Sequence, residues 1–465
     1  MKNRELRNIG IPKTAYDEAH DAIRAMMKEH ALDSESVRSR LQAMVAAPED
    51  FAADTHLGPV AARIIEIKNA RDSFVGRDDP APYRQWGDDL EQRSIEQMEW
   101  ACKLPIAVQG ALMPDAHPGY GLPIGGVLAT ENAVIPYAVG VDIACRVKMT
   151  VLDWPVDALQ SKHDALKNAL VRETQFGIGA KFKNKRQHDV LDRDWNVSPV
   201  TQANKDRAWS QLGTSGTGNH FVEYGILTVD DATVGLESGD YLALLSHSGS
   251  RGTGASVCSV YSARAMELHP ELPDELQHLS WLDLDTEDGQ EYWAAMELMG
   301  EYASANHNCI HRHIHEALGS EVLLDIENHH NFAWKEVHDD RELVVHRKGA
   351  TPAGEGVLGI IPGSMATPGF IVRGLGGDSS LNSAAHGAGR VMSRTQAIKT
   401  LNWEEAKGFL AERKVELLSA GLDEVPAVYK NIHEVMAAQS DLVEPLASFA
   451  PRMVRMAKAG ERPED

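Results

Sequence analysis

Apolar and polar residues follow two different periods in two parts of the chain. In residues 17–29 and 34–46 the apolar positions recur at helical spacing, with charged residues on the opposite face. From about residue 100, short apolar runs alternate with glycine-rich turns, which is typical of strands. These runs are residues 124–129, 134–147, 241–245, 322–326, 343–345, 357–361 and 370–372.

Longer periodic segments interrupt the strands. Residues 288–318 predict a long helix, and residues 403–420 predict another that ends at Gly421 as its C-cap. The proline-bearing stretch at 77–86 is a candidate connection between domains. We therefore expect a mixed α/β fold with a helical N-terminal extension over residues 1–95 and a single larger domain over residues 96–465.

Bulk composition excludes several classes of protein. The chain has 465 residues, 43% apolar and 25% charged, which is ordinary for a globular protein. No apolar run approaches the roughly 20 residues that span a bilayer, and the N-terminus lacks the apolar core of a signal peptide. Four cysteines without CxxC spacing argue against a disulfide framework. We expect a cytoplasmic protein with no membrane contact.

The net charge of −22 argues against general nucleic-acid binding, which normally leaves a basic footprint. It leaves room for a local basic cleft on an acidic body. If nucleic acid is the substrate, metal ions and a few arginines must supply the positive field.

Polar clusters follow several of the apolar runs. Asp142 and Cys145 are spaced so that one turn would aim both at one ion, and this pair suits a borderline ion such as Mn²⁺, Zn²⁺ or Fe²⁺. A buried cysteine beside a turn aspartate is the competing interpretation. Asn219 and His220 follow a glycine-rich segment, and His247 precedes a loop whose N–H groups would suit a phosphate.

Two further clusters lie toward the C-terminus. His329 and His330 are adjacent, so on a strand only one would face a given site. His386 lies among small residues, with Arg390 and Arg394 spaced four apart. Together the clusters form a mixed nitrogen, oxygen and sulfur ligand set that would hold two ions, which points to phosphoryl or nucleotidyl transfer.

Two other patterns have plainer explanations. His307, His311 and His315 recur every four residues on the long predicted helix, but without a metalloprotease arrangement, so we expect a packing or solvated face. The basic stretch at 181–186 is expected to be a solvated loop.

A series of strings resembles the RtcB family of RNA ligases in the family's own order. They are MPDAHPGYGLPIGG (113–126), AVGVDIAC (138–145), GTGNHFVE (216–223), HSGSRG (247–252), HHNFAW (329–334), HRKGAT (346–351), IPGSM (361–365) and HGAGRVMSR (386–394). The resemblance spans about residues 95–460 and implies a mixed α/β fold peculiar to that family around a metal-lined cleft.

The resemblance also implies residue roles. Cys145 would bridge two Mn²⁺ ions, with Asp142 and His220 completing one site and His247 and His330 the other. His386 would attack the α-phosphate of GTP and carry the guanylate. The implied nucleotide-binding residues are Asn219, Phe221, Glu223, Pro362, Gly363, Ser364, Met365, Gly387, Ala388, Tyr429 and Lys458. The residues implied for the RNA path are Arg251, Lys348, Arg390 and Arg394.

By the same resemblance, the substrates are GTP and RNA with 3′-phosphate or 2′,3′-cyclic phosphate ends and 5′-hydroxyl ends. Two other functions remain open: GMP capping of 3′-phosphates without ligation, and a non-catalytic paralogue that binds RNA ends. The natural RNA and the need for an activating protein partner also remain open.

This chain departs from the family pattern at several positions. Arg146 stands where the family generally has glycine, which is expected to place a cation beside the metals. Ala384 and Ala385 precede His386, and Gly369 stands where a serine is expected. The C-terminal sequence also differs, which bears on the role of Lys458.

Overall fold

The apolar positions of the first helices meet in a core of their own. The computed structural model describes residues 1–72 and 74–461. One compact unit comprises Met1–Gly76 and Ala263–Ser280. Its N-terminal helices are α1 (Asn3–Ile9), α2 (Tyr16–Glu29), α3 (Ser34–Ala46) and α4 (Gly58–Asp72). The two helices expected from the sequence at 17–29 and 34–46 are confirmed, and Leu6, Ile23 and Leu41 are buried in their core.

The second unit comprises Arg77–Ser262 and Trp281–Asp465. Its first elements are β1 (Tyr83–Gln85), which pairs in parallel with β2 (Ala107–His117), and α5 (Gln92–Cys102). The contacts thus divide the chain between Gly76 and Arg77, within the described residues, and the domain boundary at residue 95 stays a prediction.

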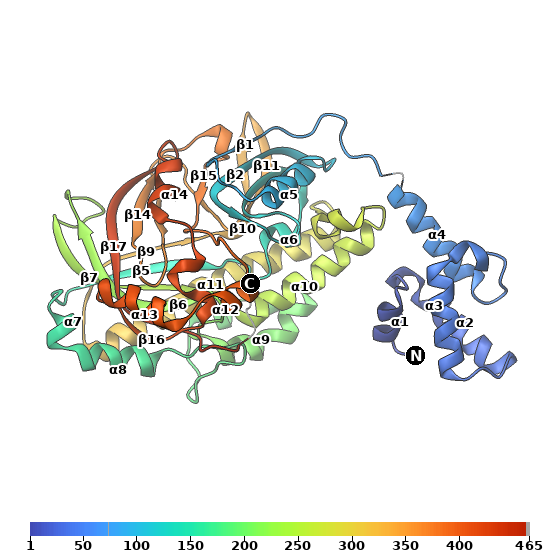
Figure 1. Ribbon diagram of the computed structural model, residues 1–465, viewed down its shortest axis with the longest axis horizontal. Coiled ribbons are helices and arrows are strands. Elements are labelled where there is room, and N and C mark those ends of the chain that lie inside the picture. Colours follow the sequence, from blue (N-terminus) through green and yellow to red (C-terminus); the bar gives the residue numbers. More distant parts are fainter. Residues whose placement is uncertain (73, 462–465) are drawn as a thin grey trace. The chain divides into compact units, whose positions relative to one another are not determined.

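An eight-stranded sheet forms the centre of the larger unit (Figure 1), with its strands in the order β13-β14-β17-β6-β7-β5-β9 and β16 pairing with β17. The strands are β5 (Arg146–Leu152), β6 (Phe221–Val229), β7 (Gly239–Ser248), β9 (Val322–His329), β13 (Leu358–Ile361), β14 (Gly369–Gly374), β16 (Glu416–Ser419) and β17 (Val443–Met456).

A five-stranded sheet has the order β1-β2-β3-β11-β10. Its remaining strands are β3 (Ile124–Thr130), β10 (Asn331–His338) and β11 (Arg341–Lys348). Two small sheets pair β12 (Ala350–Pro352) with β15 (Ser383–Ala385), and β4 (Ala133–Val134) with β8 (Leu282–Asp283). Strands β9 and β10 are consecutive but belong to different sheets, so the junction at His330 links the two sheets.

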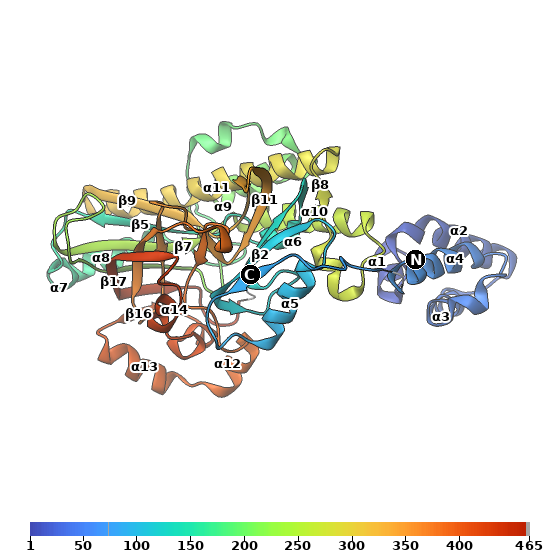
Figure 2. The same cartoon turned by 90° about the horizontal axis from the view of Figure 1, so that it is seen from above.

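The long helix expected at 288–318 is confirmed as α11 (Glu287–Leu318). The Thr286 side chain caps its first turn, and Gly319, with φ 67°, ends it. In Figure 2, α11 lies on one side of β5 and β7, while α12 (Arg394–Thr400) and α13 (Trp403–Glu412) lie on the other. The other helices of this unit are α6 (Pro136–Val139), α7 (Ala158–Ser161), α8 (His163–Glu173), α9 (Pro199–Gln211) and α14 (Ile432–Ala438), and α10 (Arg251–Leu268) continues into the first unit.

The central strands have two different buried faces. On β5, Val147, Met149 and Val151 point into an apolar cluster, while the alternate residues Lys148 and Thr150 point to the other face. In the register of the sheet, Lys148 lies between Ser246 of β7 and Glu327 of β9. The face toward α11 is therefore polar although it is buried.

Two segments differ from their predicted form. Residues 134–147 do not form one strand: β4 ends at Val134, α6 follows, and β5 begins at Arg146. Gly140, with φ 110°, ends α6. The helix predicted at 403–420 ends at Glu412, because Lys414 adopts φ 57° and the next apolar residues form β16 beside β17. Gly421 is therefore not a helix C-cap.

No helix among the described residues is both long and apolar enough to cross a membrane.

Candidate active site

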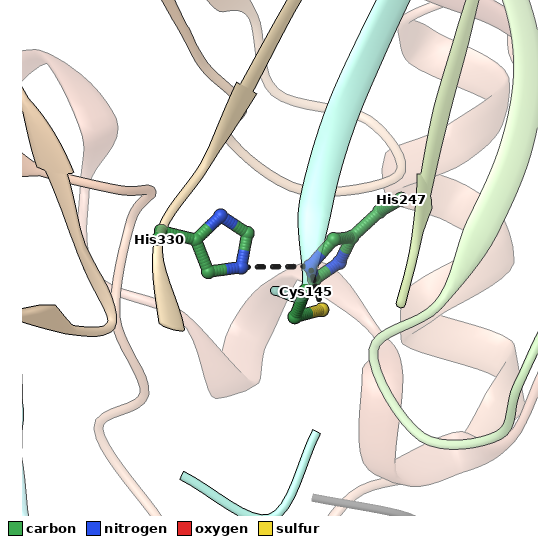
Figure 3. A group of neighbouring side chains, drawn as sticks. All are labelled: Cys145, His247 and His330. Carbon is green, nitrogen blue, oxygen red and sulfur yellow. Dashed lines mark hydrogen bonds between the residues drawn. The ribbon is translucent and has the colours of Figure 1, made fainter. Parts of the chain in front are cut away.

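Two groups of potential metal ligands share one sulfur atom. Cys145, His247 and His330 form one group, and Asp142, Cys145 and His220 form the other. The ligand atoms within each group lie within 4.8 Å of one another, and all the residues are buried. In Figure 3 the rings of His247 and His330 point toward each other, with the Cys145 side chain beside them.

The distances are those of ligands gathered around ions. Cys145 Sγ lies 3.1 Å from His247 Nε2 and 3.4 Å from His220 Nε2. His247 Nε2 lies 3.2 Å from His330 Nε2. Asp142 Oδ2 lies 3.1 Å from His220 Nε2. The turn before β5 thus supplies two ligands, Asp142 and Cys145, and His220, His247 and His330 come from three other segments.

Local backbone geometry explains why these residues meet. Asp142 and Cys145 lie in the tight turn before β5, where Ala144 adopts φ 56°. The backbone N–H of Ser250 donates to Asp142 Oδ1 at 3.1 Å. A Cβ atom on Gly249 would lie 2.2 Å from Asp142 Oδ2, so glycine is required for this close approach.

The electrostatics favour metal ligation. Burial lowers the pKa of His247 to about 3 and that of His330 well below its usual range, so both imidazoles are neutral and able to bind a cation. Burial raises the pKa of Asp142, but contacts with His220, Cys145 and Arg251 outweigh it and lower the pKa. Asp142 carries charge at neutral pH.

The donor set passes a simple test for a metal centre. Asp142 Oδ2 is buried, and its 3.1 Å approach to His220 Nε2 lacks hydrogen-bond geometry, although buried carboxylate oxygens are almost always satisfied. A thiolate, neutral imidazoles and a carboxylate together fit a borderline divalent transition ion. The residues therefore fit a metal-lined cleft.

His386 lies beside this centre. Its ring centroid is 4.7 Å from that of His330. Its Nδ1 lies 2.7 Å from Asp115 Oδ2, which also accepts from the backbone N–H groups of His386 and Gly387. An ionised carboxylate only accepts hydrogen bonds, so this contact requires a hydrogen on Nδ1 and leaves Nε2 as the ring nitrogen that Asp115 does not engage.

A cavity of about 930 Å³ contains the centre and most of the residues implied for substrate binding. Those implied for the nucleotide that line it are Asn219, Phe221, Glu223, Pro362, Gly363, Ser364, Met365, Gly387, Ala388 and Tyr429. Lys348, Arg390 and Arg394 also line it. Burial raises the pKa of Glu223 well above its usual range. Burial lowers the pKa of Lys348 to about 8, and its ammonium group donates to the Tyr120 carbonyl at 2.5 Å.

One buried carboxylate contacts three of the residues that line the cavity. Glu424 is 2% exposed and contacts Arg390, Arg394 and the hydroxyl of Tyr429. The Arg390 guanidinium also lies over the Tyr429 ring, 5.6 Å from its centroid. The residues implied for RNA and for the nucleotide are thus joined in one cluster.

Two residues implied for substrate binding lie outside this cavity. Arg251 is 2% exposed and donates to the Thr214 hydroxyl at 3.2 Å and to the Gly177 carbonyl at 2.8 Å. Lys458 is exposed beyond the end of β17. Neither residue lines the cavity, although the charge of Arg251 helps to lower the pKa of Asp142.

The departures from the family pattern have structural explanations. Because side chains alternate along a strand, Arg146 points away from the metal ligands, and it contacts Glu327 at 2.9 Å and the Gly300 carbonyl at 2.9 Å. The expectation of a cation beside the metals is therefore wrong. Ala384 and Ala385 are fully buried in β15, and a Cβ on Gly369 would lie 3.1 Å from Pro362 Cα.

The structure also places the histidines of the long helix and the basic stretch at 181–186. His307 and His311 are buried and face the central sheet, so the expectation of a packing face is confirmed for them. Within the basic stretch at 181–186, Arg186 is not solvated: it is 5% exposed and pairs with Glu173 at 3.0 Å.

Comparison with known proteins matches this geometry to a family. The family model described as tRNA-splicing ligase RtcB matches residues 97–457. The RNA-splicing ligase RtcB1 of Escherichia coli (strain ATCC 25922) is 34% identical over 399 residues, covering 78% of this chain and 94% of the relative. The tRNA-splicing ligase RtcB of Nanoarchaeum equitans is 31% identical over 426 residues, covering 76% and 88%. The chain belongs to the RtcB family.

Membership confirms the resemblance that the sequence strings carry, and the mixed α/β class with N-terminal helices is confirmed with it. The RtcB family is one of RNA ligases, and the buried cysteine and histidine cluster fits its metal-lined site.

Sequence reasoning missed two residues of this RtcB-family site, Asp115 and Glu424. Asp115 lies in the string MPDAHPGYGLPIGG (113–126) and is a fully buried acid near the end of the apolar strand β2. An acid in an apolar strand is a signal in the sequence, because a buried carboxylate needs a partner. Glu424 lies in a short acidic segment with no local signal that distinguishes it from a solvated turn.

Proposed function

We propose that this chain is a GTP- and Mn²⁺-dependent ligase that joins RNA 3′-phosphate or 2′,3′-cyclic phosphate ends to 5′-hydroxyl ends through a histidine–GMP intermediate on His386. The observation that carries the proposal is the position of His386, held by Asp115 at 2.7 Å and lying beside the paired ligand groups. A neutral histidine nitrogen beside bound cations is suited to attack on phosphorus.

His386 provides the nucleophile. Its Nε2 makes no hydrogen bond within the described residues, and its Nδ1 proton is held by Asp115. Nε2 attacks the α-phosphorus of GTP, the bond to the β-phosphate oxygen breaks, and pyrophosphate leaves. As Nε2 gains its bond to phosphorus the ring becomes cationic, and the Asp115 carboxylate stabilises that charge.

Two Mn²⁺ ions would be held by the two ligand groups, Asp142, Cys145 and His220 on one side and Cys145, His247 and His330 on the other. When bound, such ions neutralise charge on the phosphate oxygens. Cys145, 3.4 Å from His220 and 3.1 Å from His247, would bridge the ions.

The nucleotide would occupy the cavity wall formed by β6 and the loop at 362–365. Glu223, at the buried end of β6, would accept hydrogen bonds from guanine, which would return its carboxylate to the charged state. Asn219 Oδ1 is buried without a hydrogen bond within the described residues, so Asn219 has capacity for a ligand contact. Pro362, Gly363, Ser364 and Met365, with Gly387 and Ala388, would surround the phosphate.

The RNA steps follow from the same groups. Water opens a 2′,3′-cyclic phosphate to the 3′-phosphate, and an oxygen of that phosphate attacks the guanylate, which frees His386. The RNA 5′-hydroxyl then attacks the activated 3′-phosphorus, its proton leaves, and GMP is released. Lys348, Arg390 and Arg394 line the cavity and would hold the RNA phosphates. Arg251 and Lys458 would contact the substrates only if substrate binding moves the chain. We also propose a cytoplasmic location for the protein.

The test is transfer of label from α-labelled GTP in the presence of Mn²⁺, followed by a denaturing gel. Wild type is expected to become labelled and His386→Ala is expected to remain unlabelled. Absence of label in wild type would refute both enzyme functions, and label on His386→Ala would place the nucleophile elsewhere.

Two RNA strands, one with a 3′-phosphate and one with a 5′-hydroxyl, then separate ligation from capping. Ligation yields one longer strand, whereas capping stops at RNA bearing a 3′-terminal GMP. Multiple turnovers with the purified chain would show that no activating protein partner is needed.

A further inference from the structure

A buried chain of hydrogen bonds crosses the face of the central sheet that lies under α11. It is separate from the cleft and uses the histidines that recur along the long helix. Its members are, in order, Asp325, Thr150, His311, Ser246, His307 and the carbonyl oxygen of Ser248.

The contacts are short along the whole chain. Thr150 Oγ1 lies 2.7 Å from Asp325 Oδ1 and 2.7 Å from His311 Nδ1. Ser246 Oγ lies 2.7 Å from His311 Nε2 and 2.7 Å from His307 Nδ1. His307 Nε2 lies 3.1 Å from the Ser248 carbonyl oxygen.

The number of available hydrogens limits the directions that these hydrogen bonds can take. Both ends, a carboxylate and a carbonyl, only accept, so the five contacts need five hydrogens. Burial lowers the pKa of both imidazoles well below the usual range, so both are neutral. Two hydroxyls and two neutral imidazoles supply only four hydrogens. One contact therefore lacks a hydrogen.

The missing hydrogen belongs in the middle of the chain, at His311. At the outer end the Thr150 hydroxyl donates to Asp325 Oδ1 at 2.7 Å, and Asp325 also pairs with the Lys148 ammonium. The other charged groups on this face, Arg146 and Glu327, pair with each other. At the inner end the buried Ser248 carbonyl needs a donor, so His307 carries its hydrogen on Nε2 and the Ser246 hydroxyl donates to His307 Nδ1. His311 then has one hydrogen for two acceptors, the hydroxyl oxygens of Thr150 and Ser246.

We propose that His307 and His311 are positioning residues, that His307 is held in its Nε2–H form with this hydrogen donated to the Ser248 carbonyl, and that this chain of hydrogen bonds fixes strand β7 at His247. Ser246 and Ser248 flank His247, and their side chains lie on the face opposite the metal ligand. Holding both neighbours restricts the backbone that aims His247 at Cys145. The role in catalysis rests on the proposed function, whereas the hydrogen positions do not.

Thr150 offers a matched pair of substitutions. Thr150→Val keeps the shape but removes the hydroxyl, while Thr150→Ser keeps the hydroxyl and removes a methyl group. We expect Thr150→Val to lower the kcat of His386 guanylylation about tenfold with an unchanged KM for GTP, and Thr150→Ser to stay within about twofold. Equal losses, or a larger loss for Thr150→Ser, would indicate simple packing and overturn the proposal.

A second measurement is independent of activity. Imidazole nitrogen NMR on the metal-free, histidine-labelled wild-type chain, assigned with His307→Gln and His311→Gln, should show His307 protonated at Nε2. Protonation of His307 at Nδ1 would overturn the proposed direction even if the chain is an active ligase. The expected signals in a chain without ligase activity would refute the proposed function alone.

Discussion

At the scale of single residues, the Asp115 carboxyl determines which nitrogen of His386 faces the cavity. It accepts hydrogen bonds from Nδ1 and from two backbone N–H groups, and it is fully buried. It therefore orients the imidazole, and in the proposed reaction it would stabilise the charge that develops during attack.

We expect Asp115→Asn to lower the rate of guanylylation on the order of a hundredfold, because an amide stabilises a cationic imidazole poorly. Single-turnover labelling with α-labelled GTP measures this rate. Asp339→Asn is the matched control, since Asp339 is exposed in a hairpin turn with φ 48° that asparagine tolerates. An unimpaired Asp115→Asn would exclude this role for Asp115.

Lys348 gives the cleft a dependence on pH. Its pKa is lowered to about 8 by burial, so it is charged below that pH and neutral above it. The affinity for an oligonucleotide with a 3′-phosphate should therefore fall as pH rises through 8, by up to about tenfold per unit if this one charge dominates. Titration between pH 7 and 9 measures it. Lys348→Arg should flatten the profile, and a profile that keeps its slope in that variant would assign the titration to another group.

At the scale of elements, the turn before β5 and the end of β7 fit each other through a glycine. Replacing Gly249 by alanine would place Cβ against Asp142 Oδ2, at 2.2 Å in the present geometry. We expect Gly249→Ala to lose bound Mn²⁺, measured by elemental analysis after dialysis. Gly179→Ala is the control, because no atom lies within 4 Å of its added Cβ. Equal metal content in both variants would show that the turn adapts.

The polar face of β5 and β9 contains an ion pair between the buried Arg146 and the partly buried Glu327. Arg146 is 4% exposed, so removal of its partner leaves a buried charge. Glu327→Gln should lower the free energy of unfolding by about 1–3 kcal/mol, and the double variant Arg146→Met with Glu327→Met should recover part of that loss. Urea unfolding measures both. A double variant less stable than Glu327→Gln would show that the polar pair cannot be replaced by apolar packing.

Elements with a strong local pattern were predictable from the sequence, and those that depend on tertiary contact were not. The helix α11 follows its periodicity and caps, as do α2 and α3. Residues 416–419 continue the apolar pattern of α13, but they pair with β17, which no local signal reveals. Likewise, the sequence predicted no partners for the polar residues of β5. Their partners include residues of α11, which lies far from β5 in the sequence.

The site shows the same division. The family strings led to the residues that line the cavity, but spacing alone did not connect Asp115 with His386 across 271 positions. Adjacent residues of a strand, such as Cys145 and Arg146, are expected to point to opposite faces. The predicted strand at 134–147 did not include the turn before β5, and this turn determines which face each residue takes.

At the scale of the whole molecule, the net charge of −22 requires that phosphates be attracted locally. Lys348, Arg390 and Arg394 line the cavity, and bound cations would add to their field. The acidic remainder of the surface would repel RNA that is not seated in the cleft.

Metal binding should stabilise the folded chain, because the ligands come from turns and strands far apart in sequence. At a metal concentration a hundredfold above Kd, the gain is about 2.7 kcal/mol per site. Thermal unfolding with and without chelator measures it, and Cys145→Ala should show a much smaller chelator effect. A chelator effect of the same size in Cys145→Ala would place the stabilising ions elsewhere.

Glu424 has a consequence for how the two substrates influence each other. The same carboxylate holds Tyr429, which we propose for the nucleotide, and Arg390 and Arg394, which we propose for the RNA. A ligand that displaces one of these partners changes the strength with which Glu424 holds the others. Thermodynamic reciprocity then requires that guanylate alter the affinity for RNA by the same factor by which RNA alters the affinity for guanylate. With the proposed roles, Glu424 would couple the two binding equilibria across the cavity wall.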